Sequence, residues 1–139
     1  MKAQQYLEQA DKHEALIQNK QIEKAQWKDI ALSITGRYDG ERVQSSGSKQ
    51  KVSDAVNRMI MIEKEIDILI GQQIDARLEI IRTIEQLKTT EYDLLHKIYI
   101  QHMTFKEVAA AKGMSVSWAT TVHGQALQSL QKILDRRGL

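Results

Sequence analysis

Cysteine is absent from this chain of 139 residues. Without thiols there is no disulfide framework, no thiolate nucleophile and no cysteine-rich zinc site, so a reducing, intracellular setting is the natural inference. The sequence also lacks an N-terminal apolar run of the signal-peptide type and any apolar stretch long enough to span a bilayer. These absences predict a soluble, cytoplasmic protein with no membrane partner.

Proline is absent too, and Ala, Gln, Glu, Lys, Ile and Leu dominate the composition. Nothing therefore opposes long helices, and intrinsic propensity favours them. A chain of this length can hold one core of ordinary size, or a small core with an extended helical appendage. We predict an all-α fold, in which a long helical N-terminal part, hairpin or coiled-coil-like, precedes a small C-terminal domain.

Residues suited to catalysis are scarce. The sequence has no Gly-rich phosphate loop after a strand, no HExxH motif and no serine in a nucleophile-elbow pattern. None of the histidines lies three or four residues from another, so they offer no metal-binding pair; they are His13, His96, His102 and His123. We therefore expect no enzymatic activity, no metal ion and no cofactor.

Basic and acidic residues are nearly balanced over the whole sequence, and the formal net charge is only +2. Basic residues outnumber acidic ones by seven to four in residues 88–139 and by four to two in 36–52. Acidic residues lead by seven to four in 53–87, and residues 1–35 carry five of each sign. The basic excess thus lies in the middle stretch and the C-terminal third, where an anionic partner such as nucleic acid would bind.

The first part of the chain predicts a helix followed by a linker. Residues 3–34 carry an incomplete apolar stripe, namely Leu7, Ala10, Ile17, Trp27, Ala31 and Ile34. Residues 36–52 contain three glycines and three serines, which is typical of a loop. The basic residues of this stretch have two alternative roles. They contact DNA phosphates or RNA polymerase, or they only keep a flexible linker soluble; they are Arg37, Arg42, Lys49 and Lys51.

A second, longer helix is predicted over residues 53–87, with Ser53 as its N-cap. At roughly 1.5 Å per residue such a helix is about 50 Å long, too long for one small globule to cover. It needs a helical partner, which is either the first helix folded back antiparallel or the same helix of a second subunit in a homodimer or higher oligomer. Its apolar stripe is Val56, Met59, Ile60, Ile66, Leu69, Ile70, Ile74, Leu78, Ile81, Ile84 and Leu87.

The C-terminal block predicts three helices. Thr90 is the expected cap of the first, which covers EYDLLHKIYI. Thr104 with Glu107 forms a capping box for the second, and Gly113 suits the left-handed turn at its end. Ser115 caps the third, whose buried stripe is expected to be Ala119, Val122, Ala126, Leu127, Leu130, Ile133 and Leu134.

The second and third of these helices have the composition of a helix-turn-helix. Such a motif requires a small residue where the helices cross, a glycine in the turn and flanking apolar residues. The sequence supplies these in the needed order with Ala109, Gly113, Met114, Ala119 and Val122. The residues left pointing outward early in the third helix would face a DNA groove; they are Val116, Ser117, Trp118, Thr120 and Thr121.

Residues 87–134 resemble the C-terminal, promoter-reading helix-turn-helix domain (region 4) of sigma-70-type factors. The resemblance lies in TFKEVA, which fits the pattern T-x-x-E-[VI]-A, and in the GMS and ALQSL that follow it. The whole chain, with its GRYDGERVQSSGSKQK linker and IEKEIDILIGQQIDARLEIIRTI helix, resembles small phage proteins of the RinA/ArpU type. This resemblance implies a DNA-binding regulator of late transcription, of phage or prophage origin.

The chain departs from the sigma-type pattern in three places. Lys112 stands where the family usually has leucine, no Lys or Arg occurs between Lys112 and Lys132, and Gly124 lies in mid-helix. The glycine indicates either that another group approaches closely or that the helix is weak. Without an arginine on the reading face, sharp recognition of guanine is not expected, and the base preference should be modest or A·T-leaning.

Four further expectations concern Trp118, the function of the C-terminal block, a complete sigma factor and the phosphate contacts. Trp118 has an alternative place in the core, because it precedes Ala119 on the buried stripe. The C-terminal block has an alternative function, which is to dock on RNA polymerase or another protein without reading DNA. A complete sigma factor is disfavoured, because residues 1–87 lack an aromatic-rich segment suited to melted promoter bases. Phosphate contacts are expected from Lys106, Lys112, Lys132, Arg136 and Arg137.

Overall fold

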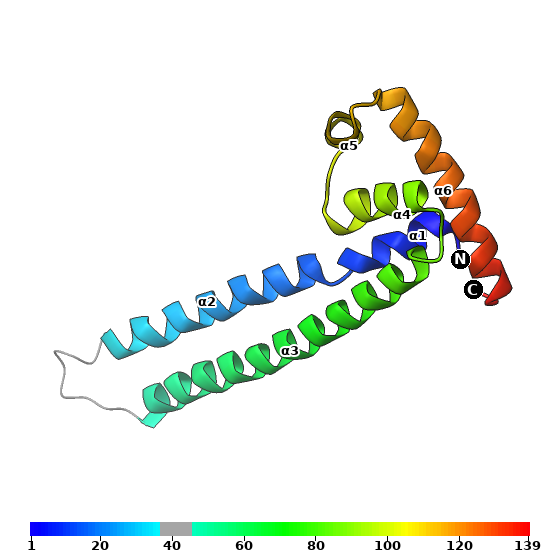
Figure 1. The fold of residues 1–139 in the computed structure, drawn as a ribbon. Helices are drawn as coiled ribbons and strands as arrows, with labels where there is room; N and C mark the ends of the chain where they lie inside the picture. The colour runs from blue at the N-terminus through cyan, green and yellow to red at the C-terminus, as the bar shows by residue number, and fades with distance from the viewer. Residues whose placement is uncertain (37–45) are drawn as a thin grey trace. The chain divides into compact units, whose positions relative to one another are not determined.

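The computed structural model describes residues 1–36 and 46–139, apart from the side chains of residues 35, 36, 46 and 48. All regular structure in these residues is helical, which confirms the predicted all-α fold (Figure 1). No helix among them is long and apolar enough to cross a membrane. In chain order the helices are α1 (Ala3–Glu8), the 3-10 turn η1 (Gln9–Asp11), α2 (Glu14–Gly36), α3 (Ser46–Ile84), α4 (Thr89–Leu95), the π-helical turn η2 (His96–Ile100), α5 (Phe105–Lys112) and α6 (Val116–Arg136).

The chain divides into two compact units. We call them the core unit, which is Met1–Lys12 together with Gln73–Leu139, and the hairpin unit, which is His13–Gln72. The long helix α3 contributes residues to both. The predicted C-terminal domain, residues 88–139, is therefore only part of a compact unit that also takes in the N-terminus and the end of α3.

In the hairpin unit, α2 and α3 run antiparallel (Figure 1). Lys20 Nζ lies 2.7 Å from Glu65 Oε2, and Lys24 Nζ lies 3.6 Å from Glu63 Oε1. Residue numbers rise along one helix as they fall along the other, as antiparallel packing requires. Of the two partners expected for the long helix, the structure therefore contains the helix from the same chain.

The apolar stripe predicted for α3 is only partly correct. A series of steps of three and four residues can drift around a helix from one face to the next. The predicted stripe therefore combined residues of the buried face of α3 with residues of an adjacent, exposed face. Five of its members are at least 40% exposed: Val56, Ile60, Ile70, Ile74 and Leu78. In the hairpin unit, the buried and half-buried apolar residues of α3 instead follow the alternating spacing of a coiled-coil seam, at Val52, Ala55, Met59, Ile62, Ile66 and Leu69.

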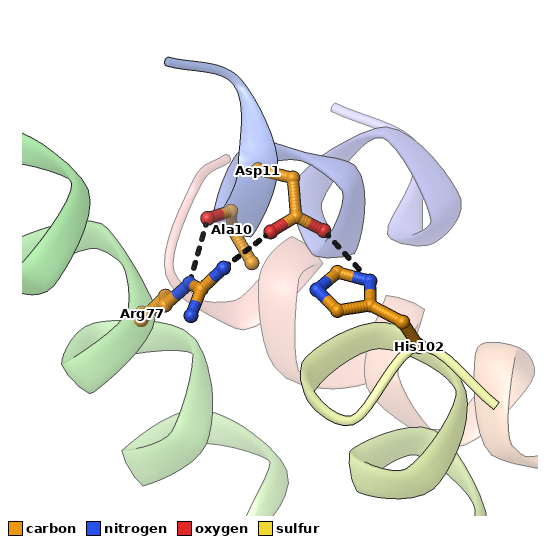
Figure 2. A network of polar contacts seen from close by, with 4 residues as sticks. All are labelled: Ala10, Asp11, Arg77 and His102. Carbon is orange, nitrogen blue, oxygen red and sulfur yellow. Dashed lines mark hydrogen bonds and ion pairs between the residues drawn. The ribbon is translucent and has the colours of Figure 1, made fainter. Parts of the chain in front are cut away.

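The first predicted helix, residues 3–34, is interrupted at η1 by contacts from other parts of the core unit. Arg77 Nε donates to the Ala10 carbonyl oxygen at 3.2 Å, and Arg77 Nη2 donates to Asp11 Oδ1 at 2.7 Å (Figure 2). His102 Nδ1 lies 3.4 Å from the other carboxylate oxygen of Asp11. Because a side chain satisfies the Ala10 carbonyl, the backbone there does not need to continue the helix.

The linker predicted at residues 36–52 ends earlier than expected. α3 already begins at Ser46, so Ser53 lies inside the helix and is not its N-cap. No proline opposes this extension, and the lysines and glutamine of KQKV, just before Ser53, are good helix formers. Of the basic residues predicted to touch a partner, Lys49 and Lys51 are exposed on α3, whereas Arg37 and Arg42 lie outside the described residues.

In the core unit, α6 packs on α1, α4 and α5. The N-terminal segment belongs to this core, because Tyr6 is 3% exposed and Leu7 and Ala10 are fully buried. The end of α3 contributes Ile80 and Ile84. The core thus joins segments from both ends of the chain, with α6 in contact with most of them.

A buried threonine connects three parts of the core unit. Thr83 is 1% exposed, and its Oγ1 donates to the Glu79 carbonyl oxygen at 2.9 Å. Because its single proton is used there, Oγ1 accepts from the Tyr6 hydroxyl and from Arg137 Nη1, each at 2.9 Å. One oxygen atom therefore joins α1, α3 and the C-terminal end of the chain.

Candidate nucleic-acid interface

The predicted helix-turn-helix corresponds to α5 and α6, and the start of α5 is fixed by its cap. The Glu107 backbone N–H donates to Thr104 Oγ1 at 3.2 Å. In return, the Thr104 backbone N–H donates to Glu107 Oε1 at 3.4 Å. This is the predicted capping box, which satisfies two backbone donors that the first turn of a helix otherwise leaves unpaired.

The turn between α5 and α6 has the predicted geometry. Gly113 ends α5 in the left-handed conformation, with a φ of +67°. The Met114 backbone N–H donates to the Ala109 carbonyl oxygen at 2.9 Å, which closes the end of α5. Ser115 Oγ then accepts from the Trp118 backbone N–H at 3.0 Å and caps α6 as predicted. Both helix ends at the turn are therefore closed by hydrogen bonds.

The buried side of α6 is the predicted one. From α5, Val108 and Ala109 are 0% and 3% exposed, and the small alanine lets the two helices approach closely. The opposite side of α6 points away from the hydrophobic core. The buried residues of α6 are Ala119, Val122, Ala126, Leu130, Ile133 and Leu134, and Leu127 is half-buried against them.

An aromatic cluster supports α6 from the side. The Tyr99 hydroxyl lies 2.8 Å from His123 Nε2, and the rings of Phe105 and His123 meet edge to face with their centres 5.1 Å apart. Burial lowers the pKa of His123, which favours the neutral imidazole. The cluster joins η2, α5 and α6, so it holds α6 in its orientation relative to the two preceding helices.

The residues predicted to read DNA lie on the first two turns of α6. Ser117 and Thr121 are exposed and lie opposite the buried stripe, at the centre of the outward side. Val116, which is 48% exposed, and Thr120 lie to one side of them. Thr120 Oγ1 donates to the Val116 carbonyl oxygen at 3.0 Å, so this hydroxyl can only accept from a ligand. The surface therefore presents hydroxyl and methyl groups.

Trp118 is half-buried, which is intermediate between the exposed position and the core position predicted for it. Its ring packs against the hydrophobic core, so it is not a freely exposed reading residue. One edge of the side chain also lines a surface hollow beside the turn. The other residues of this hollow are Thr89, Thr90, Tyr92, Asp93, Lys112 and Met114.

All five basic residues predicted to contact phosphates are exposed. Lys106 lies in the first turn of α5, and Lys132 and Arg136 lie near the end of α6. None of the three forms an ion pair within the described part of the chain. Arg136 Nε donates to the Lys132 carbonyl oxygen at 3.3 Å, which leaves the rest of its guanidinium available.

The other two predicted phosphate contacts have partners inside the core unit. Lys112 forms an ion pair with Asp93 of α4, which also accepts from Lys97 Nζ at 2.7 Å. Burial by itself raises the pKa of Asp93, but the hydrogen bonds from Lys112 and Lys97 outweigh it and lower the pKa below its ordinary value. Arg137 donates to Thr83. The sequence did not predict these internal roles, because neither partner is near in the chain.

The first helix of the C-terminal block differs in two details from the prediction. α4 begins at Thr89 with Lys88 as its N-cap, so Thr90 lies in the first turn and is not the cap. Thr89 and Thr90 are equally compatible with the start of a helix, so the sequence alone does not indicate at which of them the helix begins. After Leu95 the helix widens into η2, where the Gln101 N–H donates to the His96 carbonyl oxygen at 3.0 Å.

The outward side of α6 continues beyond the predicted reading face. Gly124, Gln125 and Gln128 are exposed there and follow Thr121 at helical spacing. The prediction stopped at Thr121 because it considered only the start of the helix. The signal that could have found these residues is the same repeat of three and four that leads on to Lys132.

Comparison with known proteins identifies the family of this chain. No curated protein and no solved structure matches it. The family model described as "Protein of unknown function (DUF1492)" matches residues 32–131, a range that includes α3, α4, α5 and most of α6. Because this match covers more than half of the sequence, the chain belongs to the DUF1492 family.

Proposed function

We propose that this chain is a sequence-specific regulator of transcription that binds double-stranded DNA through α5 and α6. We further propose that it is of phage or prophage origin and controls late genes, as its resemblance to RinA/ArpU-type proteins implies. The proposal rests on one observation, the outward side of α6. This side is polar and exposed, has no acidic residue from 116 to 134, and leads to Lys132 and Arg136. Along this stretch α6 itself presents no like charge to an anionic duplex.

The rigidity of the turn supports this proposal. A base-reading helix must be held in place by its neighbours, because small errors in its position lose hydrogen bonds to base edges. The capping box at Thr104, the left-handed Gly113 and the cap at Ser115 fix the two helix ends. The cluster around His123 fixes α6 from the side.

The chemistry of the reading face indicates a modest base preference. Hydroxyl groups such as those of Ser117 and Thr121 can bond to any base edge in the major groove, and the methyl groups of Val116 suit the thymine methyl. The face has no arginine to bond guanine at two points. We therefore propose an A·T-leaning target, with affinity supplied partly by phosphate contacts from Lys106, Lys132 and Arg136.

Selection of bound duplexes from a random DNA library would test the function. Wild-type protein should enrich one motif, whereas Thr121→Glu should bind that motif at least about tenfold more weakly, because the new carboxylate faces the phosphates. Asn57→Glu is the matched control, since it adds the same charge at an exposed position of α3. No enrichment by the wild type, or equal binding by Thr121→Glu, would contradict DNA reading by this face.

Docking on RNA polymerase without DNA reading is the second candidate function. It is favoured by apolar exposure beside the turn, where Met114 and Val116 are each 48% exposed next to the half-buried Trp118. Such a cluster suits a protein partner as well as a thymine methyl. Binding of RNA polymerase that survives Thr121→Glu but is lost in Met114→Asp, in a protein that enriches no DNA motif, would favour this function.

We also propose that the protein forms a homodimer or higher oligomer through its long helices. Among the described side chains of the hairpin unit, only Ala55, Ile62 and Ile66 are buried. Three such residues make a small core for a pair of helices of this length. The exposed Val56, Ile60 and Ile70 offer further apolar area that the same side of a second copy would cover.

A further inference from the structure

Gly124 has no role within the fold that requires glycine. It lies in the middle of α6, where glycine makes a helix less stable than alanine does. Outside its own stretch of helix, a Cβ atom placed on Gly124 would meet no atom of the described residues within 4 Å, so no neighbour there forbids a larger side chain. Gly113, in contrast, has a positive φ that favours glycine. The bare backbone at Gly124 is therefore open to close approach by a partner outside the chain, and its surroundings on α6 distinguish it from the equally open Gly71 of α3.

The surroundings of Gly124 indicate the chemistry of that partner. Gly124 lies on the outward side of α6, between Thr121 and Gln128 at spacings of three and four residues, with Gln125 beside it. Glutamine amides donate hydrogen bonds without carrying charge, and Lys132 follows one turn later. α6 itself has no Asp or Glu from 116 to 134, and the one carboxylate that lines the same hollow as Gln125 and Gln128, that of the buried Glu91, accepts a hydrogen bond from Ser129. This side of α6 therefore suits an anionic sugar–phosphate strand.

The position of Gly124 along α6 fits the same partner. Gly124 is eight residues after Val116, which is about 12 Å at 1.5 Å per residue. That length is close to the width of the major groove, about 12 Å. If the first turns of α6 contact base edges, as the N-terminal residues of recognition helices do, Gly124 reaches the wall of the groove, where a sugar–phosphate strand passes.

We propose that a DNA strand packs directly on the backbone of α6 at Gly124, and that the amides of Gln125 and Gln128 donate hydrogen bonds to its phosphate oxygens. This inference rests on the proposed DNA-binding function and adds a contact to it. Glycine would be kept because any side chain at position 124 holds the strand away from the helix. The glutamines would then bind phosphate without releasing further counterions, since they add no positive charge.

The first test measures thermal unfolding and duplex affinity together, on the motif enriched by the wild type. Gly124→Ala should raise the Tm by about 3 °C, because alanine stabilises the helix, and should lower the affinity about tenfold. Gly124→Leu should lower the affinity further. Gly71→Ala is the matched control, because Gly71 is an exposed mid-helix glycine of α3 that also has open space around it. It should raise the Tm and leave the affinity unchanged.

The second test separates the neutral contacts from the charged ones by the salt dependence of affinity. Gln128→Ala should weaken binding by a similar factor at every salt concentration, so its slope in a log–log plot matches that of the wild type. Lys132→Gln should reduce the slope by about 0.9, the value for one phosphate contact.

The outcomes of these tests distinguish this inference from the proposed function. If the wild type binds its motif and Gly124→Ala and Gly124→Leu bind it equally well, the strand contact is wrong while DNA binding stands. The same conclusion holds if Gln125→Ala and Gln128→Ala bind as the wild type does. If the wild type binds no duplex, the proposed function itself fails and this inference fails with it.

Discussion

His123 lies beneath the candidate interface, half-buried between Tyr99 and Phe105. Its burial lowers its pKa below the ordinary value of 6.5, so protonation is easier in the unfolded chain than in the folded one. Neither state is protonated well above that value, and there the residue contributes no pH dependence. As the pH falls through the ordinary value, the unfolded state binds the proton first and becomes relatively more stable.

We therefore predict that the free energy of unfolding falls as the pH drops below 6.5. Urea unfolding at a series of pH values would measure this, with His123→Gln as the comparison because glutamine is polar and does not titrate. The slope below the ordinary pKa should be smaller in the variant than in the wild type. Identical slopes would show that another group causes the pH dependence.

Other single residues differ in how far the sequence could place them. Gly113 and the caps Thr104 and Ser115 were predictable, because each acts on backbone groups within four residues of itself. The role of Lys112 was not predictable, since its partner Asp93 lies on another helix. The outward position of Gly124 follows from helical spacing, but only the structure shows that no atom of the described chain fills the space beside it.

At the scale of elements, local signals fixed some helix ends and tertiary contacts fixed others. The boundary between α5 and α6 lies where its caps predict. The break after α1 lies where no turn residue predicts one, because Arg77 takes the Ala10 carbonyl from a distant part of the chain. The start of α3 at Ser46 likewise has no strong signal in the sequence. The sequence therefore predicted helix ends best where a nearby residue of the same segment caps the helix.

The contacts of Thr83 hold α1 and the C-terminal end of the chain to α3, so their loss should be measurable. We predict that Thr83→Val lowers the free energy of unfolding by about 1–3 kcal/mol, because the buried Tyr6 hydroxyl loses its acceptor. Chemical unfolding monitored by circular dichroism would measure it. Thr89→Val, at an exposed position of α4, is the control and should change stability far less. An equally small effect of both substitutions would rule out this role for Thr83.

At the scale of the whole molecule, the two ends of the chain meet in one core. Leu7 is fully buried together with Leu130 and Leu134 of α6, more than a hundred residues away. The sequence predicted an amphipathic N-terminal helix, but not that its first segment leaves the hairpin unit and joins the core unit. A stripe of apolar residues shows that a helix face is buried, and it does not identify the surface that covers it.

The exposed apolar side of α3 leads to a prediction about assembly. Sedimentation should show a dimer or higher oligomer for the wild type, and Ile60→Glu should raise its dissociation constant at least about tenfold, because an unpaired carboxylate would be buried in the interface. Asn57→Glu is the charge-matched control on the same helix and should assemble more nearly as the wild type does. A wild-type monomer at every concentration would exclude this interface.

The sequence by itself determined the helical fold and the local geometry of the turn. The absence of proline allows helices throughout, and the capping box, Gly113 and Ser115 act over a few residues along the chain. Only the tertiary structure decided which face of α3 is buried, where the first helix breaks and which lysines remain free. These features depend on residues such as Arg77 and Asp93 meeting partners far away in the sequence, and spacing along one helix carries no information about what packs against it.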